Sequence, residues 1–278
     1  MSYRTIVVHL DCGKQRSERL DVALRFAEEF DAQLIGLFAL DLYAGMPPAA
    51  DAGSILVEAE LQRREACLGE ALAEFTRKTA RRAAKARWLS SEEDAAREVA
   101  FAARFADLIV IGQTDPGTFT DDGISANFAA DVVLTAGKPV LLVPSAGHFE
   151  AVGRHPLVAW NAAREADRAL QGSLPVLERS AAVDVVSFAE STQPDDAQAK
   201  AHNAVQAYLK DRGINATIRR YAAEHLSPGD SILSQAFRDA ADCIVMGAHG
   251  HTRRNEKRLG GVTSTVMKAT TIPVLLSR

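Results

Sequence analysis

The chain has 278 residues, which is enough for two domains of ordinary size. Its 32 lysines and arginines and its 36 aspartates and glutamates are interspersed and leave a formal net charge of -4. Proteins that bind nucleic acid or an anionic membrane surface normally carry a basic excess on one face, so this composition argues against both kinds of partner.

The cysteines and the apolar segments bear on the cellular compartment. Cys12, Cys67 and Cys243 show no paired spacing and leave an odd count, which is typical of a reduced cytosolic protein rather than a disulfide scaffold. The first residues lead directly into a strand pattern without a signal-peptide region, and no apolar run approaches membrane-spanning length. We therefore expect a cytoplasmic protein.

Strand and helix patterns alternate through the first half of the chain. Short apolar runs rich in β-branched residues predict strands, and apolar residues at helical spacing predict helices. The predicted elements are strand 6–10, helix 20–30, strand 34–40, a long helix around 61–75, a strand around Trp88, helix 92–105, strand 108–111, helix 129–134 and strand 139–143. Strands that are apolar on every residue, alternating with helices, indicate a parallel sheet covered on both faces.

The second half of the chain repeats this plan. Four apolar runs have counterparts in it: 6–8 and 157–159, 34–40 and 183–189, 109–112 and 244–247, and 139–142 and 273–276. We predict two tandem α/β sandwich domains, residues 1–145 and 155–278, each with a five-stranded parallel sheet. Ligands of such open sheets bind at the edge where the strand-to-helix loops gather.

The stretch from Gly247 to Thr265 joins a predicted buried strand to the start of a helix. Gly247 and Gly250 interrupt the apolar pattern, and the next helical pattern opens at Gly260. Backbone N–H groups at a helix N-terminus carry a positive partial charge, and glycines let a phosphate approach the main chain. Thr263 adds a hydroxyl donor, so the stretch predicts a phosphate-binding loop.

The glycine spacing resembles the nucleotide-binding signature of the universal stress protein family, in which Gly-x-x-Gly is followed after nine residues by Gly and a small residue. Gly247, Gly250 and Gly260 fall on the three glycines. Gly261 stands where ATP-binding members most often carry Ser or Thr, while Thr263 fits the hydroxyl position two residues on. The loss of one neutral hydrogen bond costs about 0.5–1.5 kcal/mol, so ATP is expected to bind about tenfold more weakly at most.

The resemblance covers nearly the whole chain and implies a tandem member with an adenine nucleotide alpha hydrolase-like, Rossmann-like fold. It implies ATP as the ligand, with Mg²⁺ carried by the nucleotide. By resemblance the adenine lies against strand backbone near Val186 and beside Met246, and Asn161 takes the nucleoside position where the family usually has Asp. The site residues expected on these grounds are Asn161, Val186, Met246, Gly247, His249, Gly250, Arg253, Gly260, Gly261, Val262 and Thr263. The family also pairs its last strands, which implies a homodimer or a pseudo-dimer through 140–143 and 274–276.

The first copy keeps Asp11 at the nucleoside position but departs from the phosphate loop. Asp115 stands at the second glycine, and the third aligns near Ser125 or Ala126. Three aspartates would face a triphosphate there, where the second copy offers the cations Arg253, Arg254, Lys257 and Arg258. Like charges repel, so we predict one nucleotide site per chain.

No catalytic or metal-binding pattern accompanies the loop. His249 and His251 lie two residues apart without a nearby cysteine or carboxylate cluster, which argues against a metal site. The chain carries no Gly-x-x-x-x-Gly-Lys-Ser/Thr loop, no Gly-x-Ser-x-Gly elbow and no Cys-x-x-Cys pair. We therefore favour a nucleotide-dependent sensor or regulator in the stress response, whose signalling partner the sequence does not name. The alternatives are a slow ATPase or adenylyl-transferring enzyme, and a protein-interaction module with a vestigial pocket.

Overall fold

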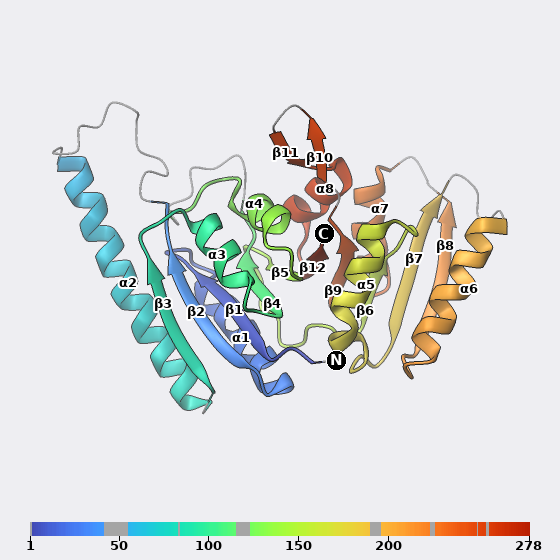
Figure 1. Cartoon of the computed structure of the whole chain (residues 1–278), viewed down its shortest axis with the longest axis horizontal. Helices are drawn as coiled ribbons and strands as arrows, with labels where there is room; N and C mark the ends of the chain where they lie inside the picture. Colours follow the sequence, from blue (N-terminus) through green and yellow to red (C-terminus); the bar gives the residue numbers. More distant parts are fainter. Residues whose placement is uncertain are drawn as a thin grey trace. The chain divides into compact units, whose positions relative to one another are not determined.

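The computed structural model describes residues 2–41, 55–82, 84–114, 123–189, 196–222, 226–248, 250–253 and 256–278. The chain divides into two compact units. The first unit is Tyr3–Ala136, and the second unit is Gly137–Arg278 together with Ser2. Strands and helices alternate in both units (Figure 1), so the predicted α/β class is confirmed.

The first unit is built on a parallel sheet. Its elements are β1 (Thr5–Leu10), α1 (Arg16–Phe30), β2 (Gln33–Ala39), α2 (Ile55–Arg81), β3 (Ala86–Ser91), α3 (Ala95–Ala103), β4 (Leu108–Gly112) and α4 (Phe128–Thr135). The strand order is β3-β2-β1-β4, and every pair in it is parallel.

The second unit carries a sheet with the order β5-β12-β9-β6-β7-β8. Its elements are β5 (Val140–Val143), β6 (Pro156–Ala159), α5 (Arg164–Leu177), β7 (Val183–Ala189), α6 (Asp196–Lys210), β8 (Ala216–Ala222), α7 (Pro228–Arg238), β9 (Cys243–Gly247), β10 (Gly250–Arg253), β11 (Glu256–Leu259), α8 (Gly261–Ala269) and β12 (Val274–Ser277). The pairs β12–β9, β9–β6, β6–β7 and β7–β8 are parallel. These five strands are the parallel sheet expected for the second copy.

The central strand β4 is buried along its whole length, and β9 is buried at all but its last residue. Ile109 and Val110 in β4, and Ile244 and Val245 in β9, expose none of their surface. Successive side chains of a strand point to opposite faces, so burial of every residue means that both faces of the sheet are covered. The carboxyl ends of the parallel strands are therefore where the loops can form a site.

One carboxylate performs the same task in each copy. Asp107 lies just before β4, and its Oδ2 accepts hydrogen bonds from the N–H groups of Arg4 and Thr5 at 2.8 and 3.0 Å. Asp242 lies just before β9, and its two oxygens accept hydrogen bonds from the N–H groups of residues 153–155 at 2.7–3.1 Å. Each carboxylate thus ties the start of the neighbouring strand, which supports the reading of the halves as tandem copies.

The last strands of the two copies pair with each other inside the second unit, as expected. β12 and β5 are antiparallel, with Leu275 opposite Leu141 and Val274 opposite Leu142. These four side chains are fully buried. This pairing and burial explain the apolar pattern of the two strands, and β12 has both of its edges covered because it lies between β5 and β9.

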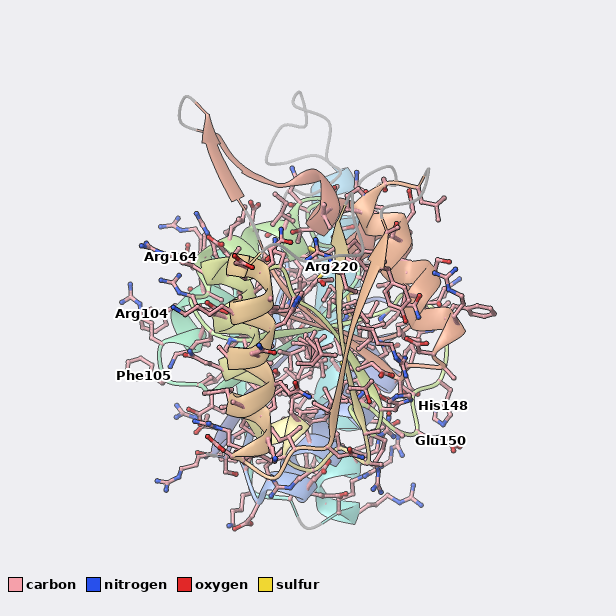
Figure 2. The ribbon with its side chains drawn as sticks, turned by 90° about the vertical axis from the view of Figure 1, so that its right-hand side faces the viewer. Arg104, Phe105, His148, Glu150, Arg164 and Arg220 are labelled. Carbon is pink, nitrogen blue, oxygen red and sulfur yellow. A yellow bond between two sulfur atoms is a disulfide. The ribbon has the colours of Figure 1, made fainter. Side chains whose placement is uncertain are left out.

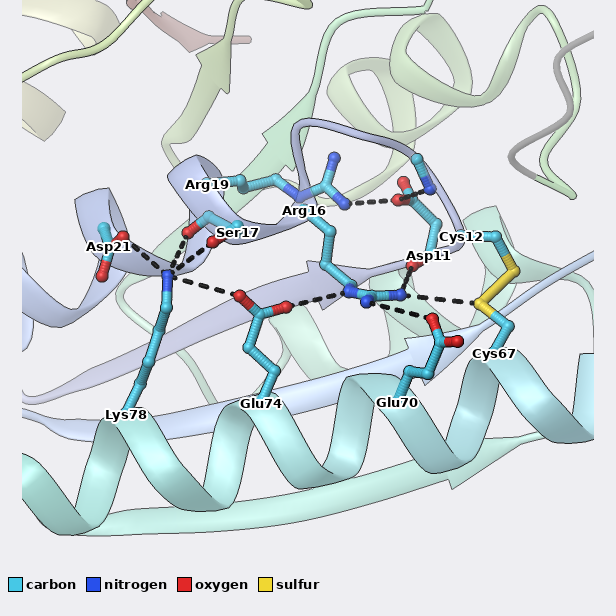
Figure 3. Close-up of polar contacts among 11 residues, drawn as sticks. Asp11, Cys12, Arg16, Ser17, Arg19, Asp21, Cys67, Glu70, Glu74 and Lys78 are labelled. Atoms are coloured by element: carbon cyan, nitrogen blue, oxygen red, sulfur yellow. Dashed lines mark hydrogen bonds and ion pairs between the residues drawn. A yellow bond between two sulfur atoms is a disulfide. The ribbon is translucent and has the colours of Figure 1, made fainter.

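The expectation of three unpaired cysteines is wrong for two of them. Cys12, in the loop after β1, and Cys67, in α2, form a disulfide with a Cα–Cα distance of 5.8 Å (Figure 3). The two cysteines are 55 residues apart, so no local spacing reveals the pair. Cys243 is free and buried in β9, and burial raises the pKa of its thiol. The argument for a reducing compartment from the cysteines therefore does not hold.

The surface carries exposed charge of both signs. Arg104 and Arg164 point away from the ribbon in Figure 2, and Glu150 is also exposed. Phe105, two residues after the end of α3, is 73% exposed and also projects outward. Among the helices of the described ranges, none is long and apolar enough to cross a membrane.

The shared role of Asp107 and Asp242 leads to a stability prediction. The carboxylate of Asp242 accepts hydrogen bonds from three N–H groups, and the replacement Asp242→Asn removes its negative charge. We therefore expect the free energy of unfolding to fall by about 1.5–3 kcal/mol. Thermal unfolding followed by circular dichroism measures the effect. The exposed Glu150→Gln is the matched control and should unfold with the parent. Equal unfolding temperatures of Asp242→Asn and Glu150→Gln would contradict the proposed role of Asp242 in fixing the start of β6.

Candidate nucleotide site

A cavity of about 510 Å³ opens in the second unit, at the carboxyl ends of β6, β7 and β9. The first turn of α8 and the starts of α5 and α7 complete its wall. The lining residues are Ala159, Trp160, Asn161, Ala163, Glu165, Ala166, Val186, Ser187, Phe188, Pro228, Ile232, Met246, Gly247, Gly260, Gly261, Val262 and Thr263. This is the edge of the sheet at which open α/β folds bind ligands.

Gly247 ends β9 and lets α5 lie directly against the strand. A Cβ at this position would be 2.5 Å from the carbonyl carbon of Glu165 and 2.6 Å from the nitrogen of Ala166. Both atoms belong to the helix backbone, which cannot rotate away as a side chain can. The glycine is therefore required for packing, and the close approach brings the first turn of α5 to the cavity wall.

The first turn of α8 forms the opposite part of the wall. Gly260 is its N-cap residue, with extended backbone (φ -63°, ψ 154°) and no side-chain cap hydrogen bond. The first N–H groups of an α-helix have no partner within the helix, and their partial charge favours anions. A Cβ at Gly261 would meet no atom of the described residues within 4 Å, so on their side the approach to this turn is open.

Polar side chains at the strand ends shape the rest of the cavity. The Oδ1 atom of Asn161 accepts a hydrogen bond from the N–H of Ala163 at 3.2 Å, which fixes the loop between β6 and α5. The indole N–H of Trp160 donates to Asp167 at 2.9 Å. Ser187 lies 3.2 Å from the imidazole Nε2 of His202. Burial and the charge of Arg220 lower the pKa of His202.

Most of the residues expected from the sequence lie together around this cavity. Those that line it are Asn161, Val186, Met246, Gly247, Gly260, Gly261, Val262 and Thr263. Gly250 and Arg253 are the ends of β10, and only their backbone is described. His249 lies outside the described residues, as does Arg254.

The stretch between the second and third glycines differs from the simple loop that the sequence suggests. β10 and β11 form an antiparallel hairpin in which Gly250 pairs with Leu259 and Arg253 with Glu256. Figure 1 shows this hairpin projecting beyond the start of α8. Glycines and charged residues gave no alternating apolar pattern, so the strands were not recognisable.

Several lining residues are not among those expected from the sequence. Trp160 is 7% exposed and lines the cavity next to Asn161. Glu165 comes from the first turn of α5, and Pro228 and Ile232 come from α7. α7 lies well before the glycine loop in sequence, so only the fold brings it to the site. Within the described ranges, no group of three potential metal-ligating side chains is present.

Comparison with known proteins gives the family. The model of the universal stress protein family matches residues 2–144 and 157–278. The chain belongs to the universal stress protein family. Two family matches in one chain agree with the tandem plan read from the sequence.

Individual relatives are distant. Universal stress protein Slr1230 of Synechocystis sp. is 25% identical over 176 residues, which are 62% of this chain and 58% of that protein. The match thus spans less than two thirds of the relative. A universal stress protein of Archaeoglobus fulgidus has 15% identity and a TM-score of 0.73, over 99% of this chain and 96% of that one. A functionally unknown protein of Pseudomonas aeruginosa has 16% identity and a TM-score of 0.64, over 99% and 92%. These structural matches concern the fold.

The first copy of this universal stress protein fills the equivalent region with its own side chains. Asp11 is 1% exposed and forms an ion pair with Arg19, with Oδ1 and Nη2 at 2.7 Å (Figure 3). The guanidinium of Arg19 also lies against Gly112, the counterpart of Gly247, where a Cβ would collide with it. Asp11 accepts a hydrogen bond from the N–H of Gly13 at 2.9 Å, just as Asn161 does from Ala163. Asp11, which the resemblance places at the nucleoside position, is thus held by Arg19 and by the N–H of Gly13.

The backbone amides of the first copy are also satisfied internally. Oδ2 of Asp41 accepts a hydrogen bond from the N–H of Ser125 at 2.7 Å, and Oδ1 accepts from the N–H of Ala95 at 2.9 Å. Ser125 aligns near the third glycine of the motif. A carboxylate of the protein therefore holds an amide at the position where an anion would bind. The substituted loop with Asp115 lies outside the described residues.

The ion pair is part of a fully buried cluster with His9. Burial lowers the pKa of His9 to about 4, with a further contribution from Arg19, while Asp11 acts in the opposite direction. Burial alone would raise the pKa of Asp11, but Arg19 and His9 outweigh it and hold that pKa below its usual value. The imidazole Nε2 lies 2.8 Å from the carbonyl oxygen of Ala39, to which a neutral ring donates its proton.

The two cavity glycines should respond differently to a methyl group. Gly247→Ala forces the new Cβ into the backbone of α5, so we expect a loss of about 1–3 kcal/mol in unfolding free energy. Gly261→Ala enters open space and should stay within about 0.5 kcal/mol of the parent. Parallel thermal or urea unfolding tests the pair. A Gly247→Ala variant as stable as Gly261→Ala would contradict the packing role of Gly247.

The buried His9 should give the stability a pH dependence. The unfolded chain protonates this histidine near pH 6.5, whereas the folded chain does so only near pH 4. The contribution of neutral His9 to the free energy of unfolding is therefore complete above pH 6.5. It is lost as the pH falls toward 4, and the loss is roughly 3 kcal/mol. Unfolding free energies measured from pH 7 to 4 for the parent and for His9→Gln test this. The variant should lack that part of the slope, and parallel curves would refute the assignment.

Proposed function

We propose that this universal stress protein binds ATP in the cavity of its second copy and acts as a nucleotide-dependent regulator in the cytoplasmic stress response. The observation that carries the proposal is that residues expected to bind the nucleotide lie around the same cavity. Gly247 and Gly260 of the family's nucleotide signature, and Val186 and Met246 at the expected base position, line one cavity. Its volume of about 510 Å³ lies in the usual range of small-molecule sites.

The two sides of the cavity suit the two ends of a nucleotide. Val186 in the middle of β7 and Met246 near the end of β9 are buried apolar residues, and they offer an apolar surface to the adenine. The uncapped first turn of α8, with Gly261 and Thr263, offers backbone amides and a hydroxyl side chain to the phosphates. Asn161 stands between them, at the strand end assigned to the ribose.

The lining also fits the Mg²⁺ that accompanies ATP. Glu165 is the one carboxylate among the described lining residues, and Asn161 adds an amide oxygen. Mg²⁺ prefers oxygen ligands and is usually held by one or two protein groups together with phosphates. Mg²⁺ bound there would neutralise phosphate charge. Glu165 would then hold the metal rather than repel the nucleotide.

The first copy is not expected to contribute a second site. Arg19 occupies the space beside Gly112, and Asp41 already accepts the N–H of Ser125. A nucleotide would have to displace both contacts. We therefore propose one nucleotide per chain.

Variants at Gly261 provide the sharpest test. Gly261→Ser restores the hydroxyl that ATP-binding relatives carry and should tighten ATP by up to about tenfold. Gly261→Asp puts a carboxylate beside the phosphates and should weaken ATP by at least about tenfold, although an acidic residue suits the first turn of a helix. Isothermal titration with Mg²⁺-ATP measures both constants and the stoichiometry. Ala126→Asp, near the equivalent position of the first copy, is the matched control and should bind as the parent does.

The same samples separate the alternatives. No binding by a folded parent protein would reject the nucleotide proposal and favour a protein-interaction module. If ATP binds in the second copy, Gly261→Asp should weaken ATP binding more than Ala126→Asp does. Equal affinities of the two variants would mean that ATP binds elsewhere. Incubation with ATP and analysis for ADP or AMP would reveal an enzyme, and Glu165→Gln would then test whether the cavity carries the activity.

A further inference from the structure

Cys12 and Cys67 lie in a setting that favours reversible thiol–disulfide chemistry. Cys12 immediately follows Asp11 and is partly exposed, whereas Cys67 is 7% exposed. The disulfide joins the loop after β1 to α2, within the first unit. Cys12 is therefore the more accessible of the two cysteines, while Cys67 is shielded.

A guanidinium lies beside the shielded sulfur. Nη1 of Arg16 is 3.6 Å from Sγ of Cys67 and donates to the carbonyl oxygen of Asp11 at 3.1 Å. Nε of Arg16 donates to Glu74 at 3.2 Å, and Nη2 lies 3.9 Å from Glu70 (Figure 3). These contacts hold the positive charge next to Cys67. A nearby cation stabilises a thiolate and makes it a better leaving group.

The disulfide also fastens one particular part of α2. In α2, residues 58–66 are half-buried or exposed, and Cys67 is the first buried position in residues 58–81. Beyond it, Phe75 packs into the space left by Gly36. Lys78 bonds to Asp21 at 2.6 Å. In the described part before Cys67, the contact of Arg64 with the carbonyl oxygen of Ser91 at 2.9 Å also reaches the sheet.

We propose that Cys12 and Cys67 form a redox site whose substrates are low-molecular-weight thiols and their disulfides. In reduction, a thiolate attacks Sγ of Cys12, the Cys12–Cys67 bond breaks and Cys67 leaves as a thiolate beside Arg16. A second thiolate attacks the mixed disulfide, so two small thiols become one disulfide and the protein gains two thiols. Oxidation runs the same steps in reverse. Reduction releases the turns of α2 that precede Cys67.

Glutathione is the probe for the first measurement. The protein is equilibrated without nucleotide in buffers of different reduced-to-oxidised glutathione ratio, alkylated and analysed by peptide mass spectrometry. We expect Cys12 and Cys67 to change together, from fully protected to fully alkylated, as the ratio rises. Two thiols that stay alkylatable in excess oxidised glutathione, or a disulfide that resists excess reduced glutathione, would overturn the proposal. A Cys243→Ser variant should give the same curve, since that thiol is buried and unpaired.

Two further readouts distinguish a redox site from a static cross-link. Reduction should increase hydrogen exchange in residues 58–70 and leave 74–81 nearly unchanged, and Cys12→Ser with Cys67→Ser should show no response to reductant. Arg16→Gln should slow reduction by about tenfold because it removes the charge beside the leaving sulfur, and Arg16→Lys should restore much of the rate. Equal rates of disulfide reduction in the parent, Arg16→Gln and Arg16→Lys would show that Arg16 does not assist the reaction. Unchanged hydrogen exchange in residues 58–70 would show that reduction does not release α2.

Discussion

The close contact between α5 and β9 at Gly247 is the constraint on which the candidate site depends. With no side chain at that position, the helix backbone lies against the end of the strand. The loop between β6 and α5 is then held at the carboxyl edge of the sheet by Asn161. The cavity is bounded on one side by this helix and on the other by α8. The first glycine of the signature therefore acts by packing, while Gly261 leaves open space at the helix start.

The first copy uses the same backbone plan with a different filling. At Gly112 the neighbouring group is the guanidinium of Arg19, and that charge requires a buried counter-ion, which Asp11 supplies. A buried charge without a partner is costly, so Arg19 and Asp11 are energetically linked and neither can be exchanged alone. A nucleotide entering here would have to break the pair. Position 169 corresponds to Arg19 in the repeat and is alanine, so the second copy has no such demand.

The fold was predictable because it depends on patterns that a sequence shows directly. Strands such as 109–112 and 244–247 are apolar on every residue, and their repetition at matching places fixed the tandem plan. The glycines of the signature, and Val186 and Met246 in the cavity wall, were predictable from the resemblance to the family. The hairpin of β10 and β11 was not, since its residues lack alternating hydrophobicity. Pro228 and Ile232 reach the cavity only through the packing of α7, a long-range fact that local pattern does not contain.

The disulfide illustrates the same limit with larger consequences. Counting three cysteines gave an expectation of free thiols, but the topology brings the end of β1 to the middle of α2. The loop that follows the first strand carries different functional groups in the two copies. In the second copy it holds Asn161 at the wall of a cavity, and in the first it holds Asp11 and Cys12 side by side in sequence, one ion-paired and the other cross-linked. Arg16 contacts both the carbonyl oxygen of Asp11 and the sulfur of Cys67, so the ion-paired residue and the disulfide share this neighbour. The two copies thus use the same strand-end loop differently, since one loop borders a cavity and the other carries the disulfide.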